Sequence, residues 1–540
     1  MSVKLEDYLQ PFRVGIETLY DLSCRLSEAY SKLAESSDHF IPTAITQLPT
    51  GHETGRYLAV YVGLSYLRVA FIDLLGDQQI EGHARVRRTL EKAWPIEKHL
   101  RQDHSADLFT WIGDCIAEVV ADRLANPSEE RIDQITTGIS FCLPIKQDSL
   151  DEAILMPTGK GFSLSSDLNL RQSLLNGYER HTYSSHGDDA NVPAKRRRLF
   201  SLPKLKVAVM INDTTATFAS LAYLIPSLPN TRVVMGLIVG AGCNTTVPMK
   251  LSNLHASKTR PILEKHPNAE NALISTEWTL STAAAPFDEL GIRTKWDHQL
   301  DQHCKRPGFQ PMEYMIGGSY TGELVRIVCY DWFQGSLGIP HSSLPTKLVE
   351  EYSLSTDFLS LVVASSLSDE RLSTELSKTL IPPTDSDWAW SPDSARAVRV
   401  IASAVQDRAA SLVASAVVGL LDCTKEVMLD PRETNGYNRA SKPHGTENTN
   451  SPSALASTPW GSGPEELAVA FSGGVIQHYP NYKESVQRCI DRLLLRAGPQ
   501  AGGKSVFLRE ASDGGLIGTG VLAGTASGEI GEIKVTLTST

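Results

Sequence analysis

The sequence predicts an α/β protein built from two domains. A chain of 540 residues is too long for one compact core. Apolar runs of strand length alternate with helix-length segments, a pattern that packs helices against sheets. The composition, with 41% hydrophobic and 21% charged residues, is that of a folded, soluble chain.

The first half of the chain supplies these elements in order. Residues 14 to 34 place apolar side chains at helical spacing and predict a packing helix. The runs YLAVYVGL and LRVAFIDLL surround a short turn and predict two strands. The segment LFTWIGDCIAEVVADRL predicts a helix, and ITTGISFCLPI predicts the strand after it.

The second half continues the alternation. Residues 207 to 223 read as an apolar strand followed by a helix, and residues 233 to 250 contain a strand and the turn Gly240-Ala241-Gly242. Residues 395 to 422 are rich in alanine and apolar nearly all round, which predicts a buried helix. No internal repeat is evident at a fixed period.

Two segments break the globular pattern and predict disordered loops. Residues 181 to 200 lack periodicity, and residues 431 to 463 are rich in Asn, Ser, Thr, Gly and Pro. The first loop ends in a basic run formed by Lys195, Arg196, Arg197 and Arg198. This run is either a solvated charged loop or a nuclear import signal read by an import receptor. Four charges without a recognition helix do not predict direct nucleic-acid binding.

Charge and cysteine content narrow the function classes. A formal charge of −11 argues against a general nucleic-acid or anionic-membrane surface. The eight cysteines form no CxxC pair and no metal spacing, so each is expected to be a small buried hydrophobe in a reducing compartment. The N-terminus shows no secretory signal, and no apolar run approaches about 18 residues. We therefore expect a cytoplasmic or nuclear protein without a membrane span or a metal site.

Several polar residues stand at the ends of predicted strands. Asp213 or Thr214 could be a helix N-cap, or Asp213 could act as a general base at the edge of an α/β sheet. The Gly240-Ala241-Gly242 segment is, by itself, most simply a hairpin turn. Glu277 and Glu313, each taken alone, would be surface or helix-start residues.

The order of these motifs resembles that of the hexokinase family, from about residue 45 to residue 530. The matching segments are LPTGHETGRYLAV, SFCLPIKQDSLDEAILMPTGKGF, Asn212-Asp213-Thr214, GAGCN, Thr276-Glu277-Trp278 and RPGFQPME. The resemblance implies the two-domain actin-like (ASKHA, ribonuclease H-like) hexokinase fold. The small domain would comprise residues 58–211 and 513–540, and the large domain residues 1–57 and 212–512.

The resemblance also implies a hexose site. Thr158 and Lys160 would grip the sugar from the small domain, and Asp213 would take the proton from the 6-hydroxyl as it attacks the γ-phosphate of ATP. The residues that would bind the sugar hydroxyls are Asn212, Asn244, Glu277 and Glu313. In the small-domain sugar loop the chain departs from the family pattern at Cys142, Leu143, Pro157 and Gly159.

The implied nucleotide site departs further. The family's first phosphate hairpin, Leu-Asp-Leu-Gly-Gly-Thr-Asn-Phe-Arg-Val, aligns with residues 60–69, where Tyr61 replaces the aspartate that orients Mg²⁺ and Leu64 replaces a glycine. Ser65 and Tyr66 replace threonine and asparagine, and Ala241 replaces a threonine. A phosphate hairpin needs glycines and a carboxylate, so this ATP site is degraded. Its remaining positions are Gly63, Ser65, Arg68, Gly240, Gly242, Gly473 and Gly514.

The sequence therefore predicts a divergent, fungal-type hexokinase-like protein that binds glucose. The departures gather on the ATP side, which favours a regulatory, sugar-sensing protein with a protein partner and weak or absent phosphorylation. The alternatives are an active hexokinase or glucokinase that uses Mg-ATP, and an interaction scaffold that binds neither ligand.

Overall fold

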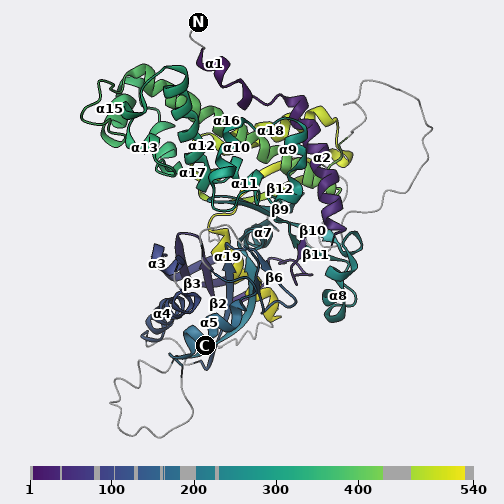
Figure 1. Cartoon of the computed structure of the whole chain (residues 1–540). Helices are drawn as coiled ribbons and strands as arrows, with labels where there is room; N and C mark the ends of the chain where they lie inside the picture. The colour runs from purple at the N-terminus through teal and green to yellow at the C-terminus, as the bar shows by residue number, and fades with distance from the viewer. Residues whose placement is uncertain are drawn as a thin grey trace, which may run out of the picture.

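The computed structural model describes residues 4–36, 39–77, 85–102, 104–126, 132–157, 162, 164–182, 202–225, 230–429 and 464–528. These residues form two lobes, each built on one mixed β-sheet with helices packed against it (Figure 1). This arrangement confirms the predicted α/β class. The predicted loop 431–463 and nearly all of the loop 181–200, with its basic run, lie outside the described residues.

The sheet of the smaller lobe has the strand order β4-β3-β2-β5-β8. Its strands are β2 (Thr54–Val62), β3 (Tyr66–Leu75), β4 (Val86–Pro95), β5 (Gln134–Phe141) and β8 (Lys204–Asn212). The first three form an antiparallel meander, whereas β5 runs parallel to both β2 and β8. A two-stranded ribbon, β6 (Ile145–Lys146) with β7 (Ile154–Leu155), completes the lobe.

Strand β2 shows how this sheet is covered. Leu58 and Val60 belong to the apolar cluster that includes helices α4 (Ser105–Leu124) and α5 (Leu170–Glu179). Tyr57 and Ala59 belong to a different cluster on the opposite face. Because side chains alternate along a strand, Tyr61 shares the face of Tyr57 and Ala59 and packs against that second cluster. The short helix α3 (Lys98–Gln102) precedes α4.

The sheet of the larger lobe repeats the same topology. Its order is β1-β11-β10-β9-β12-β13. The strands are β1 (Ile41–Pro42), β9 (Thr231–Val239), β10 (Cys243–Lys250), β11 (Asn271–Ser275), β12 (Glu466–Ser472) and β13 (Ser505–Glu510). Here β9, β10 and β11 form the antiparallel meander, and β12 runs parallel to β9 and β13. Apart from the additional edge strand β1, the two sheets thus share a strand order although their sequences show no repeat.

Most helices belong to the larger lobe and surround its sheet (Figure 1). They are α1 (Leu5–Tyr8), α2 (Ile16–Ala34), α8 (Ala256–Lys265), α9 (Ala285–Glu289), α10 (Lys295–His303), α11 (Pro311–Ile316), α12 (Gly318–Tyr330), α13 (Thr346–Val349), α14 (Thr356–Phe358), α15 (Asp369–Thr379), α16 (Pro392–Cys423), α17 (Gly474–His478) and α18 (Tyr482–Ala497). Short 3-10 turns occupy Gln10–Phe12, Leu251–Asn253, Ser281–Ala283, His341–Ser343 and Ala501–Gly503, and π-helical turns occupy Asp331–Ser336 and Leu359–Val363.

Helix α16 is the centre of the larger core, as its all-round apolar sequence predicts. Among the described helices it is the one long and apolar enough to cross a membrane, but 83% of its most apolar stretch is buried inside the protein. Packing against α2 and α18 therefore accounts for its composition. All eight cysteines are buried and free, which confirms that they act as small hydrophobes.

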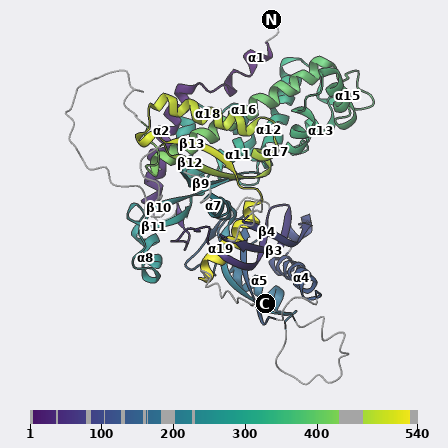
Figure 2. The ribbon, with the colours of Figure 1, turned by 180° about the vertical axis from the view of Figure 1, so that it is seen from behind.

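Two helices lie between the sheets, α7 (Asp213–Leu224) and α19 (Gly514–Ser527), as both views show (Figures 1 and 2). Their apolar side chains join a cluster that draws on both lobes. Gly518 of α19 lies so close to Ala216 of α7 that a Cβ there would collide with the Ala216 carbonyl. This close contact places the N-termini of both helices where the two lobes meet.

Candidate active site

A cleft of about 740 Å³ opens between the lobes. Its walls come from the β2–β3 hairpin, the β9–β10 turn, and the first residues of α7, α17 and α19. In open α/β sheets, ligands bind beyond the carboxyl ends of the parallel strands, and β8, β9 and β12 end here. The cleft is therefore the candidate site, and its two sides differ in chemistry.

The first polar group of the site stands where β8 becomes α7. Asn212 is the N-cap, because its Oδ1 accepts hydrogen bonds from the Thr214 amide (3.0 Å) and hydroxyl (2.7 Å). Its Nδ2 donates to the Leu143 carbonyl oxygen (3.1 Å), which ties α7 to the segment between β5 and β6. The expectation that Asp213 or Thr214 caps this helix is wrong. Asp213 is the first helical residue and lines the cleft at 7% exposure.

A buried amide and carboxylate form the second polar group. Asn244 of β10 donates through Nδ2 to Glu277 Oε1 (2.6 Å), and the Ser275 hydroxyl donates to the same oxygen (3.1 Å). The Glu277 amide returns a hydrogen bond to Asn244 Oδ1 (3.1 Å). This contact holds Glu277 at φ 47°, a left-handed conformation that is strained for a non-glycine residue. The carboxylate is thus fixed in position before any ligand arrives.

Glu313 is the third carboxylate. It lies in the first turn of α11, is 1% exposed, and accepts a hydrogen bond from the Cys243 amide (3.0 Å). Asp213, Asn244 and Cys243 line the cleft, whereas Glu277 and Glu313 lie directly behind it, each bonded to a lining residue. The structure therefore brings together the predicted residues of the large-domain side. Thr158 and Lys160 lie outside the described residues.

On the opposite side, the ring of Tyr61 occupies the mouth of the β2–β3 hairpin. A Cβ added to Gly63 would lie 3.1 Å from the Tyr61 ring, and one added to Gly515 would also lie 3.1 Å from it. The phenol therefore packs between the hairpin and the start of α19. Burial raises the pKa of Tyr61 well above its usual value, and the charge of Asp213 raises it further, so the phenol stays neutral beside that carboxylate.

Three glycine turns that line the cleft, one from the smaller lobe and two from the larger, have amides that are already hydrogen-bonded within the protein. Gly63 donates to the Tyr66 carbonyl oxygen (2.9 Å), and Gly240 donates to the Gly242 carbonyl oxygen (2.9 Å). The second bond closes the β9–β10 hairpin, so the Gly240 segment is a hairpin turn that also lines the cleft. Gly473 donates to Gln477 Oε1 (3.0 Å) and has φ 115°, which only glycine adopts readily.

Arg68 is also held within the protein. Its guanidinium bonds to Asp513 (2.5 Å) and to Glu91, and Arg88 contacts Asp513 as well. Burial opposes ionisation of Asp513, but the hydrogen bond and charge of Arg68, together with Arg88, hold its pKa below the usual value. Gly514, the next residue, starts α19 and lies so close to α7 that a Cβ would sit 3.0 Å from the Thr217 Cα.

Sequence reasoning missed three residues that hydrogen-bond to predicted site positions. Asp513 and Glu91 pair with Arg68, and Gln477 accepts from the Gly473 amide. Asp513 lies 445 residues from Arg68, and no local pattern links them. The Gln477 contact with Gly473 spans four residues and is compatible with one helical turn, but only the structure shows that the amide is taken.

Sequence models of one family match almost the whole chain. One model described as hexokinase matches residues 4–223 and a second matches residues 234–525. The chain belongs to the hexokinase family. It is 26% identical to Hexokinase-7 of Oryza sativa subsp. japonica over 90% of this chain and 88% of the rice protein. It is 23% identical to the hexokinase of Kluyveromyces lactis over 94% of this chain and 90% of that protein.

Solved structures confirm the fold. The hexokinase of Schistosoma mansoni complexed with glucose has a TM-score of 0.70 with 21% sequence identity, covering 96% of this chain and 98% of that one. The predicted two-domain, actin-like hexokinase fold is therefore correct.

Hexokinases use ATP with Mg²⁺, but the described residues here do not fit the phosphates of that nucleotide. A phosphate hairpin requires open amides and a carboxylate for the hydrated ion. In this chain Tyr61 stands in the hairpin, and its ring packs against Gly63 and Gly515, where the family pattern expects a carboxylate. Arg68 already pairs with two carboxylates.

Proposed function

We propose that this hexokinase-family chain binds a hexose, of which glucose is the first candidate, and transfers phosphate from ATP weakly or not at all. One observation carries the proposal. The buried Asn244–Glu277 pair stands fixed on one side of the cleft, while on the other the Tyr61 ring packs against Gly63 and Gly515 at the hairpin that would hold the phosphates.

The polar side suits a hexose because each sugar hydroxyl both donates and accepts a hydrogen bond. Ionised carboxylates only accept, and amides do both, so Glu277, Asn244 and Asp213 can pair with several hydroxyls of one ring. The Schistosoma hexokinase that shares this fold was solved with glucose. In the proposed complex, Thr158 and Lys160 complete the site from the smaller lobe.

A ligand that contacts both lobes favours the closed arrangement by its differential affinity. The proposed output is regulatory: a protein partner distinguishes the closed from the open surface. Nuclear entry through the basic run at Lys195 to Arg198 belongs to the same proposal. The replaced residues of the phosphate hairpin, Tyr61 and Leu64, support a role that does not depend on turnover.

Paired calorimetry on one purified sample tests the proposal. Glucose should give a saturable heat at millimolar concentration or below, and Mg-ATP should give none in the same range. Small-angle scattering with glucose should show a smaller radius of gyration. Absence of both heat and compaction with glucose would refute the proposal.

The second candidate function is an active hexokinase or glucokinase. Asp213 favours it, because a carboxylate at the start of α7 lines the cleft and could accept the proton of a sugar hydroxyl. A coupled ADP-release assay with glucose, fructose and mannose decides between the two. Turnover in the range of about 1–100 per second would establish the kinase.

A further inference from the structure

The ring of Tyr61 is held between two glycines at one wall of the cleft. A Cβ added to Gly63 would lie 3.1 Å from the Tyr61 Cε1 atom, and a Cβ added to Gly515 would lie 3.1 Å from Cε2. Both edges of the ring are therefore covered, which fixes its orientation. The atoms nearest to both glycines are ring carbons, and Tyr61 lines the cleft, so the hydroxyl at the tip of the ring stays available to a ligand.

The first turn of α19 connects Tyr61 to Asp213. Gly515 in that turn contacts the Tyr61 ring, and a Cβ at Gly514 would sit 3.0 Å from the Thr217 Cα of α7. The Thr217 hydroxyl donates to the Asp213 carbonyl oxygen (2.9 Å), one turn earlier in α7. Tyr61 and the first turn of α7 therefore pack against the same turn of α19, and both Tyr61 and Asp213 line the cleft.

Tyr61 and Asp213 offer a ligand hydroxyl complementary halves of a hydrogen-bond pair. An ionised carboxylate only accepts hydrogen bonds, whereas a neutral phenol can donate one. Burial and the charge of Asp213 raise the pKa of Tyr61, so the phenol keeps its proton. Within the described part of the chain, the Tyr61 hydroxyl makes no hydrogen bond. A ligand hydroxyl between the two groups would donate to Asp213 and accept from Tyr61.

The neighbouring polar groups of this wall are less suited to donate to a ligand. The guanidinium of Arg68 is paired with Asp513 and with Glu91. Cys142 also lines the cleft, but a thiol is a weak hydrogen-bond donor. The phenol of Tyr61 is therefore the group that can give a ligand a strong hydrogen bond here.

One hydroxyl of a hexose fits the position between these two groups. In the proposed complex, hydroxyls on the sugar ring pair with Asn244 and Glu277, which are fixed on the larger-lobe side. The 6-hydroxyl is carried by a rotatable carbon outside the ring, so it can reach across to the opposite wall. It is also the hydroxyl that the family resemblance assigns to Asp213. A pentose such as xylose lacks this group.

We infer that Tyr61 is a specificity-determining residue of the sugar site: its phenol donates a hydrogen bond to the hexose 6-hydroxyl, which in turn donates to Asp213. The inference rests on the proposed function and gives Tyr61 a role in binding besides its effect on the phosphate side. The ring closes the phosphate hairpin, and the hydroxyl selects sugars that carry a 6-hydroxyl. The site therefore prefers glucose to 6-deoxyglucose and to xylose.

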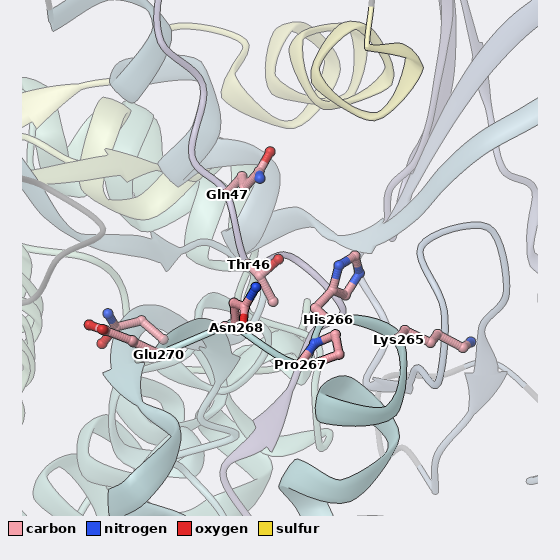
Figure 3. Close-up of a pocket in the computed structure, with 9 residues that line it drawn as sticks. Thr46, Gln47, Lys265, His266, Pro267, Asn268 and Glu270 are labelled. Atoms are coloured by element: carbon pink, nitrogen blue, oxygen red, sulfur yellow. The ribbon is translucent and has the colours of Figure 1, made fainter.

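The hollow formed by residues 46–47 and 265–271, of about 440 Å³, is also lined by polar groups. Lys265 and Glu270 point in opposite directions there (Figure 3). Lys265 Nζ already donates to the Asp148 carbonyl oxygen (2.7 Å). Because these charged groups do not converge on a ligand, we assign the sugar to the cleft.

Calorimetry with glucose, 6-deoxyglucose and xylose tests the inference on the wild-type protein and on Tyr61→Phe, which keeps the ring and removes the hydroxyl. The substitution should weaken glucose binding about fivefold, because one hydrogen bond is lost. It should leave the affinities for 6-deoxyglucose and xylose unchanged, because those sugars have no 6-hydroxyl. The matched control is Tyr30→Phe, which removes a buried hydroxyl without a hydrogen-bond partner from the core of the larger lobe. Melting temperatures check that both variants fold.

The outcomes separate this inference from the proposed function. Glucose binding that Tyr61→Phe does not change overturns the inference and leaves the proposed glucose binding intact. An equal loss for glucose and 6-deoxyglucose in Tyr61→Phe does the same, as does equal affinity of the wild type for these two sugars. A wild-type protein that gives no heat with any of the three sugars overturns the proposed function and the inference with it.

Discussion

The two sides of the cleft differ in whether their polar groups remain available to a ligand. On the large-lobe side, Asn244 and Glu277 hold each other in place, and the carboxylate stays close to the ligand space. Around the glycine turns, Gly63 of the smaller lobe and Gly240 and Gly473 of the larger lobe donate their amides to other groups of the protein, and the Tyr61 ring packs against Gly63 and Gly515. A binding surface therefore needs polar groups that are held in place and still accessible to a ligand. Glycine turns alone do not supply such groups when their amides are already hydrogen-bonded within the protein.

The largest expected effect is on glucose affinity and comes from a substitution on the polar side of the cleft. Glu277→Gln should weaken glucose binding about a hundredfold, because it replaces a fixed charged acceptor with a group that can also donate and leaves neighbouring donors poorly paired. Calorimetry measures the change. Glu264→Gln, at an exposed position on α8, is the matched control and should bind glucose normally. Unchanged affinity in Glu277→Gln would show that the sugar does not use this carboxylate.

The next effect is on the rate of ATP-dependent phosphorylation and comes from two substitutions in the β2–β3 hairpin. The double variant Tyr61→Asp with Leu64→Gly should raise ATP-dependent sugar phosphorylation about tenfold or more, because it empties the space against Gly515 and adds a carboxylate at the hairpin. Coupled ADP release with glucose measures the rate. If the rate does not rise in a folded double variant, the Tyr61 ring is not what limits phosphoryl transfer.

A smaller effect concerns the ion pairs that close the hairpin side. The pKa of Asp513 is lowered in the folded protein, so its contribution to stability is present above the unfolded value of about 3.9 and is lost as the pH falls through the folded value. Asp513→Asn should therefore reduce stability near pH 7 by less than about 1 kcal/mol, since the pair is partly exposed to solvent. Melting curves at pH 7 and at about pH 3 measure this, and the difference between variant and wild type should be smaller at the lower pH. A loss that persists in acid would indicate a packing role instead.

The smallest expected effect comes from Tyr66, the other tyrosine of the hairpin. Tyr66 is 55% exposed, so Tyr66→Asn should change ATP-dependent phosphorylation by less than about twofold and stability by less than about 0.5 kcal/mol. The same coupled assay applies. If Tyr66→Asn raised the rate as much as the Tyr61→Asp, Leu64→Gly double variant does, Tyr66 rather than Tyr61 would be the residue that limits phosphoryl transfer.

Local sequence was a reliable guide to the elements. The apolar spacing of residues 14 to 34 predicts α2, and the all-round apolar run of residues 395 to 422 predicts the central helix α16. Both depend on periodicity within one segment, which a chain carries wherever it folds. The hexokinase motifs likewise gave the family, because each is a short stretch whose residue types are set by its own turn or strand end.

The helix cap shows where local reasoning stops short. Asn212, Asp213 and Thr214 are all common capping residues, and their sequence does not rank them. The structure selects Asn212, because the Leu143 carbonyl oxygen engages the other end of its amide. The roles of Thr158 and Lys160, and of the basic run, remain predictions because they lie outside the described residues.

The sequence by itself determined the class of fold, the family and the residue types on each side of the cleft. Only the tertiary structure decided what those residues touch. The alternation of side chains along β2 directs Tyr61 to the face that α19 covers, and chain folding brings Gly515 against its ring. Chain folding also joins Arg68 to Asp513 and gives both sheets the same order of five strands, to which the larger sheet adds β1. These contacts link residues far apart in the chain, and their energies depend on packing and charge in three dimensions, which no local pattern encodes.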